Sequence, residues 1–135
     1  MMVTEALADI LSEFEDIEDR TQRFELLFDL AEDVDALPPE EWTEDNRVKG
    51  CQSQAHIAVR IEDGIVHLRG GADARIVQGL MGLLSLGMNG QTVDVARQVT
   101  LDIVESAGVL NSLTPSRSNG FRTMYDMVIG QLREA

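Results

Sequence analysis

The chain contains very little cysteine and no long apolar run. One cysteine among 135 residues excludes an internal disulfide, and a secreted protein of this size more often uses several. No apolar run approaches the ~18 residues that suggest a membrane span, and the N-terminus lacks the basic and apolar regions of a signal peptide. We therefore expect a cytoplasmic protein that does not enter a membrane.

Aromatic residues are also scarce, at 4% of the chain, so a core must be built mainly from aliphatic side chains and methionine. The single tryptophan, Trp42, is expected to pack against the domain rather than to bind a ligand. The length favours one domain over residues 1–135, and a chain of this size buries roughly two-thirds of its unfolded surface on folding. We expect such a domain to need no disulfide or structural metal ion.

Positive charge is scarce in the N-terminal third. Residues 1–50 carry 16 acidic and 4 basic side chains, residues 51–135 carry 8 acidic and 7 basic ones, and the net charge is −13. Binding to phosphates or to anionic lipid needs clustered Lys and Arg, so the sequence argues against a nucleic-acid partner and against a membrane surface. The acidic third is either a solubilising face or a surface that steers the chain toward a basic partner.

Two amphipathic helices are predicted in the first forty residues. Apolar residues recur at helical spacing over residues 6–14, with Thr4 as the N-cap, and over residues 24–34, with Asp19 as the N-cap. The apolar stripe of the second helix comprises Phe24, Leu27, Phe28, Ala31 and Val34. Leu37-Pro38-Pro39 is expected to end this helix, because a proline disfavours helical backbone in the residue before it.

A β-hairpin is predicted over residues 55–69. Asp63-Gly64 is a strong two-residue turn signal between two alternating segments. With this turn, the register pairs Glu62 with Ile65, Ile61 with Val66, Arg60 with His67, and Val59 with Leu68. The apolar partners then share one face, which we expect other elements to cover. Arg47-Val48 is a candidate third strand.

The C-terminal half predicts further helices. A segment that begins at residues 72–73 is apolar nearly all round through Leu86, which is typical of a central buried helix. We expect Gly79 and Gly82 in this segment to permit close packing rather than to mark a nucleotide site. Three more helices are predicted at residues 92–98, 101–107 and 121–132, the last after a polar turn at 113–120. The order predicts an α+β fold with a small antiparallel sheet of two or three strands and about five to six helices, not a repeating βαβ array.

The lone thiol lies in the polar stretch Arg47-Val48-Lys49-Gly50-Cys51-Gln52-Ser53-Gln54. A thiol that reaches the active site of another protein must lie on a loop, and Gly50 lets the backbone turn tightly without an obstructing side chain. Lys49 and Arg47 bring positive charge, which favours the reactive thiolate. The alternative is that Cys51 is a small buried hydrophobic residue, a common situation for a free cysteine.

Other patterns that carry chemistry are weaker. In the predicted register His56 and His67 share the non-core face of the hairpin, where Asp63 or Asp73 would complete a metal site, but we interpret both as surface histidines. A structural zinc or iron–sulfur site usually has several Cys or His ligands, so we expect no metal. No known protease signature surrounds Cys51, which disfavours a papain-like hydrolase, and there is no P-loop, GxGxxG or HExxH motif.

Several blocks of the chain together resemble the SufE family of sulfur acceptors, which are partners of pyridoxal-phosphate cysteine desulfurases in iron–sulfur cluster biogenesis. These blocks are Leu37-Pro38, the loop Gly50-Cys51-Gln52-Ser53-Gln54 before a strand, Ala72-Asp73-Ala74 with Ile76-Val77 and Gly79-Leu80, and Leu113-Thr114-Pro115-Ser116-Arg117-Ser118-Asn119-Gly120, which resembles the family motif LTPSRS-x-G. They follow one another in the family's order over residues 24–132. The chain departs from the family at His56, where members often have an aromatic residue, and in a hairpin turn that is shorter than in some members.

The resemblance implies the SufE/NifU (IscU-like) fold and a protein that is not itself an enzyme. A SufS- or CsdA-like desulfurase, whose cofactor is pyridoxal phosphate, would hand sulfur to Cys51. The Cys51 persulfide would then pass to a scaffold complex for iron–sulfur cluster assembly, and removal of sulfur would activate the desulfurase. We expect no cofactor in this chain, and whether it forms a homodimer is open.

The resemblance also implies roles for residues near the thiol. Gly50, Gln52 and Ser53 would shape the loop and the docking surface. Arg117 would stabilise the thiolate, the persulfide or the complex, or would only tie down its own turn. Asp73 lies at a helix start near the loop, where its ordinary role is that of an N-cap.

Two alternatives to a sulfur carrier remain. One is an iron–sulfur scaffold or metal-binding protein of related fold, and the other is an interaction domain with an inert cysteine. The single cysteine favours the carrier over the scaffold, because a scaffold needs several ligands.

Overall fold

A computed structural model of the protein describes residues 3–51 and 53–134. The helices are α1 (Glu5–Asp16), α2 (Arg20–Leu30), α3 (Arg75–Met88), α4 (Val93–Ala96), α5 (Leu101–Ser106) and α6 (Pro115–Arg133), and the strands are β1 (Asp35–Ala36), β2 (Ala55–Glu62) and β3 (Ile65–Ala72). Short 3-10 turns lie at Ala31–Asp33, Pro39–Glu41 and Val109–Ser112. This is the predicted α+β fold.

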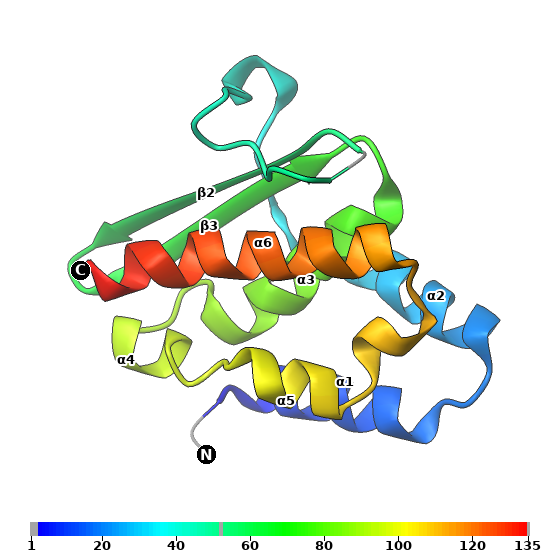
Figure 1. Ribbon diagram of the computed structural model, residues 1–135. Coiled ribbons are helices and arrows are strands. Elements are labelled where there is room, and N and C mark those ends of the chain that lie inside the picture. Colours follow the sequence, from blue (N-terminus) through cyan, green and yellow to red (C-terminus); the bar gives the residue numbers. More distant parts are fainter. Residues whose placement is uncertain (1–2, 52, 135) are drawn as a thin grey trace.

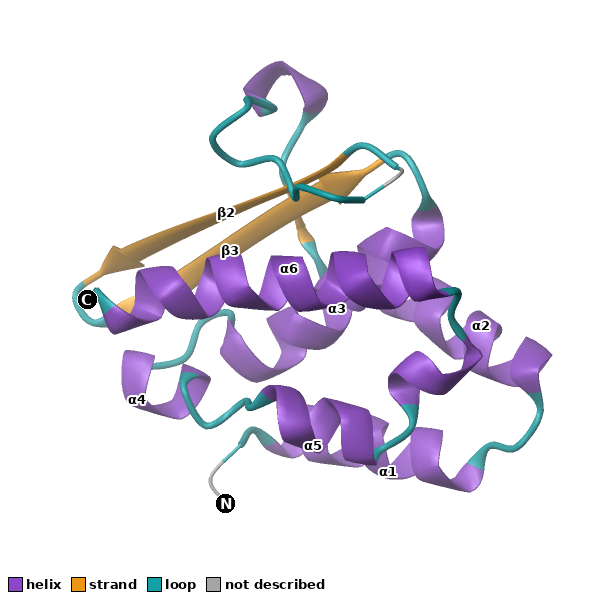
Figure 2. Ribbon diagram, viewed as in Figure 1, coloured by secondary structure: helices purple, strands orange, loops and turns teal. Residues whose placement is uncertain are grey.

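The elements lie in layers with the sheet on one side. In Figure 1 the hairpin of β2 and β3 lies over α6 and α3, and α1 and α5 lie on the far side of the molecule from the sheet. Figure 2 shows that most of the remaining chain is helical. Among the residues that the structure describes, no helix has the length and apolar character needed to cross a membrane.

The hairpin has the predicted register. Glu62 pairs with Ile65, Ile61 with Val66, Arg60 with His67, and Val59 with Leu68. The backbone of Asp63 and Gly64 has positive φ angles of 53° and 76°, as the tightest hairpin turns require. Val66 and Leu68 are buried on the face toward the helices.

The third strand differs from the prediction. It is β1, which runs parallel to β3 and pairs Asp35 with Arg69, so the sheet is mixed, with the order β1-β3-β2. The candidate strand at Arg47-Val48 forms only an isolated antiparallel bridge, between Arg47 and His56. The backbone cannot continue this ladder, because it turns away at Gly50, where φ is 79°.

The N-terminal helices begin where the sequence predicts. The side chain of Thr4 accepts a hydrogen bond from the Leu7 N–H, and that of Asp19 accepts from the Thr21 N–H. The end of α2 was predicted wrongly, since the helix stops at Leu30 and the chain continues through a 3-10 turn into β1.

One residue of the predicted apolar stripe on α2 faces water. Phe28 is 40% exposed, whereas Leu27 and Leu30 are buried. The predicted stripe was therefore centred on the wrong edge of the helix, because α3 covers Leu27 and Leu30 instead.

The central helix α3 is buried nearly all round, as predicted. A Cβ atom added at Gly79 would overlap the carbonyl oxygen of Leu27, and one added at Gly82 would overlap that of Leu30. The two glycines therefore allow the backbones of α2 and α3 to approach closely, which confirms the packing interpretation.

Candidate functional site

Cys51 lies on a loop that leaves and rejoins the edge of β2. The loop is closed at its base by the Arg47–His56 bridge, where the Val48 N–H donates to the Ala55 carbonyl at 2.8 Å. Val48 is fully buried and anchors the first leg of the loop in the core. Cys51 is a free thiol, half-buried and packed against the core. It is therefore neither the fully buried residue of the alternative interpretation nor a fully solvated one.

The wall behind the thiol is the first half of α6. A Cβ atom added at Gly120 would lie 3.5 Å from the Cys51 Sγ and 3.6 Å from its Cβ, so the bare backbone of Gly120 faces the thiol. The predicted polar turn at 113–120 is in fact mostly helical. Thr114 is the N-cap of α6 and Pro115 its first residue, a position that favours proline. The motif that contains Gly120 thus meets the Cys51 loop in space.

Arg117 lies in the first turn of α6 and is half-buried. Its backbone N–H donates to the Thr114 Oγ1 at 3.4 Å. The guanidinium Nη1 is buried and has no hydrogen-bond partner within the described part of the chain. No hydrogen bond joins Arg117 to Cys51 among those residues, so the structure brings the two onto neighbouring segments without pairing them. An unsatisfied buried N–H is available for an anionic acceptor.

Asp73 takes a different role from the predicted one. The N-cap of α3 is Ala74, and within residues 3–51 and 53–134 no side chain caps this helix, so the N-cap interpretation of Asp73 is wrong. Its side chain is exposed, and its backbone N–H donates to the Gln54 carbonyl at 3.0 Å. Asp73 therefore ties the second leg of the loop to the approach to α3.

The remaining predicted loop residues are placed unequally. Gly50 is exposed and supplies the positive φ at the turn before the thiol. Ser53 is half-buried. Gln52 lies outside the described residues.

Lys49 and Arg47, the two cations near the loop, form ion pairs with Glu44 rather than with the thiol. The Lys49 Nζ lies 2.7 Å from the Glu44 Oε1, and the Arg47 Nη1 lies 3.6 Å from the Glu44 Oε2. The hydrogen bond from Lys49 holds the pKa of the Glu44 carboxyl below its ordinary value. The positive charge that we expected to favour the thiolate is therefore partly neutralised.

A buried polar cluster at the base of the loop was not predicted. His56 is only 4% exposed, which corrects its interpretation as a surface residue. Its ring stacks on Trp42 with centroids 4.7 Å apart, and Trp42 in turn donates from Nε1 to the Leu37 carbonyl at 2.9 Å. The ring nitrogens of His56 lie 2.7 Å from the Asn46 Oδ1 and 3.1 Å from the Gln54 Oε1. Burial is the main cause that lowers the pKa of His56.

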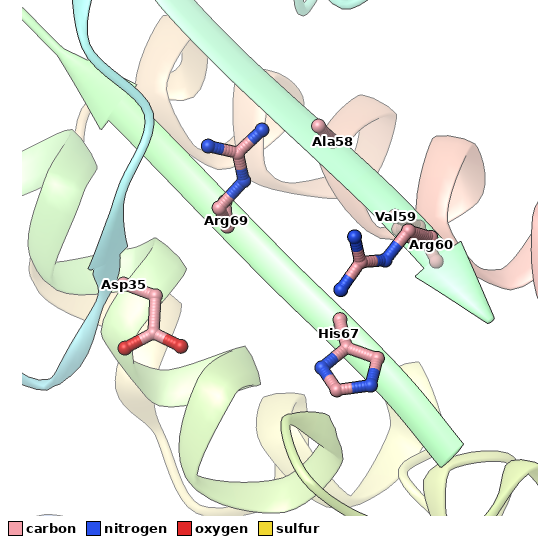
Figure 3. Close-up of a pocket in the computed structure, with 6 residues that line it drawn as sticks. All are labelled: Asp35, Ala58, Val59, Arg60, His67 and Arg69. Carbon is pink, nitrogen blue, oxygen red and sulfur yellow. The ribbon is translucent and has the colours of Figure 1, made fainter. Parts of the chain in front are cut away.

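His67 shares the face of His56 but not its environment. It lines an open hollow of about 450 Å³ on the outer face of the sheet, with Asp35, Arg60 and Arg69 (Figure 3). Arg69 is paired with Glu41 at 2.9 Å, and Arg60 with Glu62 at 3.4 Å. The hollow therefore carries balanced rather than strongly positive charge. Among the described residues, no three His, Cys, Asp or Glu side chains form a group that would hold a metal ion.

The chain is similar to known proteins along nearly its whole length. Residues 8–132 match the SufE family, described as the Fe-S metabolism associated domain. An uncharacterised SufE-like protein of Synechocystis sp. is 38% identical over 122 residues, which cover 90% of this chain and 77% of the relative. The SufE-like protein 1, chloroplastic/mitochondrial, of Arabidopsis thaliana is 28% identical over 123 residues, which cover 90% of this chain and 33% of that protein.

A solved structure has the same fold. The solution structure of a hypothetical protein from Thermus thermophilus superposes with a TM-score of 0.81 at 26% identity, and the match covers 99% of this chain and 98% of that one. The two chains therefore share one fold over nearly their whole length.

Proposed function

This chain belongs to the SufE family of Fe-S metabolism associated domains, and on that premise we propose that it is a sulfur acceptor for a cysteine desulfurase. Its acceptor atom is the Sγ of Cys51. The desulfurase carries pyridoxal phosphate and releases sulfur from cysteine, and this chain carries that sulfur onward to iron–sulfur cluster assembly. The chain contributes a thiol and a docking surface, and the desulfurase performs the catalysis.

The transfer is an exchange between a thiolate and a persulfide. The Cys51 thiolate attacks the outer sulfur of the persulfide on the desulfurase's own cysteine, and a new S–S bond forms. The bond between the outer and inner sulfur atoms breaks, and its electron pair leaves on the desulfurase cysteine as a thiolate. No external oxidant or reductant is consumed. Cys51 then holds a persulfide, which a nucleophile of the next acceptor attacks in the same way.

The observation that carries this proposal is the position of the only thiol. Cys51 sits on a loop, is half-buried, and rests against the bare backbone of Gly120. Such a thiol is sheltered in the free protein, yet it moves outward if the loop swings away from α6. Shelter matters because a cysteine thiolate is oxidised irreversibly beyond the sulfenic acid. The buried Nη1 of Arg117 on the adjacent helix is a donor for the anionic persulfide.

Mass spectrometry of the intact protein tests the proposal. The reduced protein is incubated with a cysteine desulfurase and cysteine, and Cys51→Ser serves as the control. We expect one added sulfur atom on the wild-type chain, lost on reduction, and none on the variant. Desulfurase turnover should also rise only with the wild-type chain.

The same samples, supplied with ferrous iron, separate the carrier from the scaffold. A scaffold takes up iron and holds it through several ligands, whereas this chain has a single cysteine. Iron bound to the chain in place of added sulfur, or sulfur added equally to Cys51→Ser, would contradict the proposal.

A further inference from the structure

The two legs of the Cys51 loop are joined at their base by one imidazole. His56 faces Arg47 across the backbone bridge that closes the loop. Its Nδ1 contacts Asn46 on the first leg, and its Nε2 contacts Gln54 on the second. Residues 37–49, which carry Asn46, form an arch beside the sheet on the side away from α6 and α3 (Figure 1). The ring therefore fastens this arch to the segment that carries the thiol.

The surrounding hydrogen bonds decide which ring nitrogen carries the proton. The Asn46 Oδ1 also accepts a hydrogen bond from the Thr43 N–H at 3.0 Å, and the Asn46 Nδ2 donates one to the Glu41 carbonyl at 3.0 Å. The amide of Asn46 is thus oriented, and the Nδ1 of His56 must donate to its oxygen. In the structure the Gln54 Oε1 lies 3.1 Å from Nε2, an arrangement that suits a protonated Nε2; when the ring is neutral, the Gln54 NH2 donates to Nε2 instead. Since Gln54 is exposed, its amide turns to suit either form.

Since the hydrogen bonds suit either form, burial decides whether the His56 ring is neutral or charged in the closed loop. The ring is 4% exposed and stacked on Trp42, and a buried charge is costly. Burial is the largest effect and lowers the pKa of His56, and the positive charge of Arg47 lowers it further. A backbone hydrogen bond with Thr43 and the negative charge of Glu44 act in the opposite direction, but the pKa remains below its ordinary value. Gly71, directly across on β3, brings no side chain. The neutral ring is the form that stays under Trp42.

We propose that His56 is a positioning residue that holds the Cys51 loop closed while its ring is neutral and loosens the loop when the ring is protonated. The inference rests on the proposed function, in which the loop must leave α6 to present Cys51. A closed loop binds the proton less readily than an open one, so a falling pH favours opening. The equilibrium begins to shift toward the open loop as pH falls below 6.5, the ordinary pKa of histidine. The shift reaches its full extent below the lowered pKa of His56 in the closed loop.

The test follows ring protonation and thiol access in the same protein. The chain has two histidines, so proton NMR gives two imidazole titrations, and His67→Gln identifies which one belongs to His56. Alkylation of Cys51 by iodoacetamide is measured across the same pH range, and each rate is divided by the thiolate fraction obtained from ultraviolet absorbance. His56→Phe keeps a ring to stack on Trp42 but removes both ring nitrogens. His67→Gln is the matched control on the same face of the hairpin.

We expect the normalised rate of the wild-type chain to rise about threefold to tenfold as pH falls through the His56 titration, because a ring buried under Trp42 accommodates the positive charge less well than a solvated ring does. His67→Gln should follow the same curve, whereas His56→Phe should be faster at neutral pH and independent of pH. A flat wild-type curve, or one whose midpoint follows His67, overturns the inference. If His56→Phe does not fold, the wild-type and His67→Gln curves still decide the matter.

The assay contains no desulfurase, so its outcome is independent of sulfur transfer. A flat curve from a protein that still gains sulfur on Cys51 would remove the role of His56 and leave the proposed function intact. A protein that gains no sulfur would remove the proposed function, whatever its alkylation curve.

Discussion

Replacing Gly120 with alanine tests whether α6 is the wall against which Cys51 rests. The new methyl carbon would lie 3.5 Å from the Cys51 Sγ and 3.6 Å from its Cβ, which are ordinary van der Waals distances. The substitution therefore fits without a clash and covers more of the thiol. Gly130 provides a matched control, since it also lies in α6 and a Cβ atom there meets none of the described residues within 4 Å.

Both substitutions should stabilise the protein, but only one of them should slow access to the thiol. Alanine inside a helix is favoured over glycine by about 1 kcal/mol, so both variants should gain free energy of unfolding, and Gly120→Ala should gain the larger amount because its methyl group also packs against Cys51. In Gly120→Ala the added methyl group packs against the thiol and stabilises the closed loop by about 0.8 kcal/mol relative to the open one. We therefore expect Gly120→Ala to slow alkylation of Cys51 about fourfold and Gly130→Ala to leave the rate unchanged.

Urea unfolding under reducing conditions and the rate of iodoacetamide alkylation at one pH measure these two quantities. Equal alkylation rates in Gly120→Ala and Gly130→Ala would show that the thiol does not rest on Gly120 in solution. A large loss of stability in Gly120→Ala alone would show that the space beside the thiol is smaller than the structure indicates. Either result refutes the picture of a thiol sheltered by α6.

Two other substitutions test the packing around the site. Gly82→Ala drives a methyl group into the Leu30 carbonyl of α2, and overpacking of this kind costs about 1–3 kcal/mol. The urea midpoint of this variant should therefore fall, although alanine is the better helix former. A midpoint at or above the wild-type value would contradict the close approach of the two helices. Tyr125→Phe removes the hydrogen bond from the buried hydroxyl to the Val99 carbonyl at 2.9 Å, and should cost about 1 kcal/mol in urea unfolding at pH 7. Because burial raises the pKa of Tyr125 above its ordinary value of 10.0, the unfolded chain loses the phenolic proton first and stability falls as pH rises past that value. The phenylalanine variant should lack this alkaline loss, and a loss of equal size in both proteins would refute the assignment.

Local patterns in the sequence determined much of the fold. The register of the hairpin followed from Asp63-Gly64 and the alternation around it, because a two-residue turn leaves only one pairing that puts the apolar residues on one face. The sequence also predicted the N-caps Thr4 and Asp19 and the buried character of α3, and the structure confirms all three. Each of these features depends on residues close together in the chain.

The candidate thiol could also be predicted from the sequence, since its loop is polar and it is the only cysteine. The residues that surround the thiol could not be predicted. The meeting of Cys51 with Gly120 joins segments that no local pattern relates. The same holds for β1, whose two-residue parallel pairing with β3 is too short to leave a periodic signal.

His56 shows most clearly what the tertiary structure alone decided. By alternation it lies on the outer face of the hairpin, as predicted, and such a face is normally solvated. It is buried because residues 37–49 fold back and lay Trp42 over its ring, and that segment has no periodicity from which its path can be read. The sequence determines which face a side chain takes, but only the packing of distant segments determines whether that face meets water.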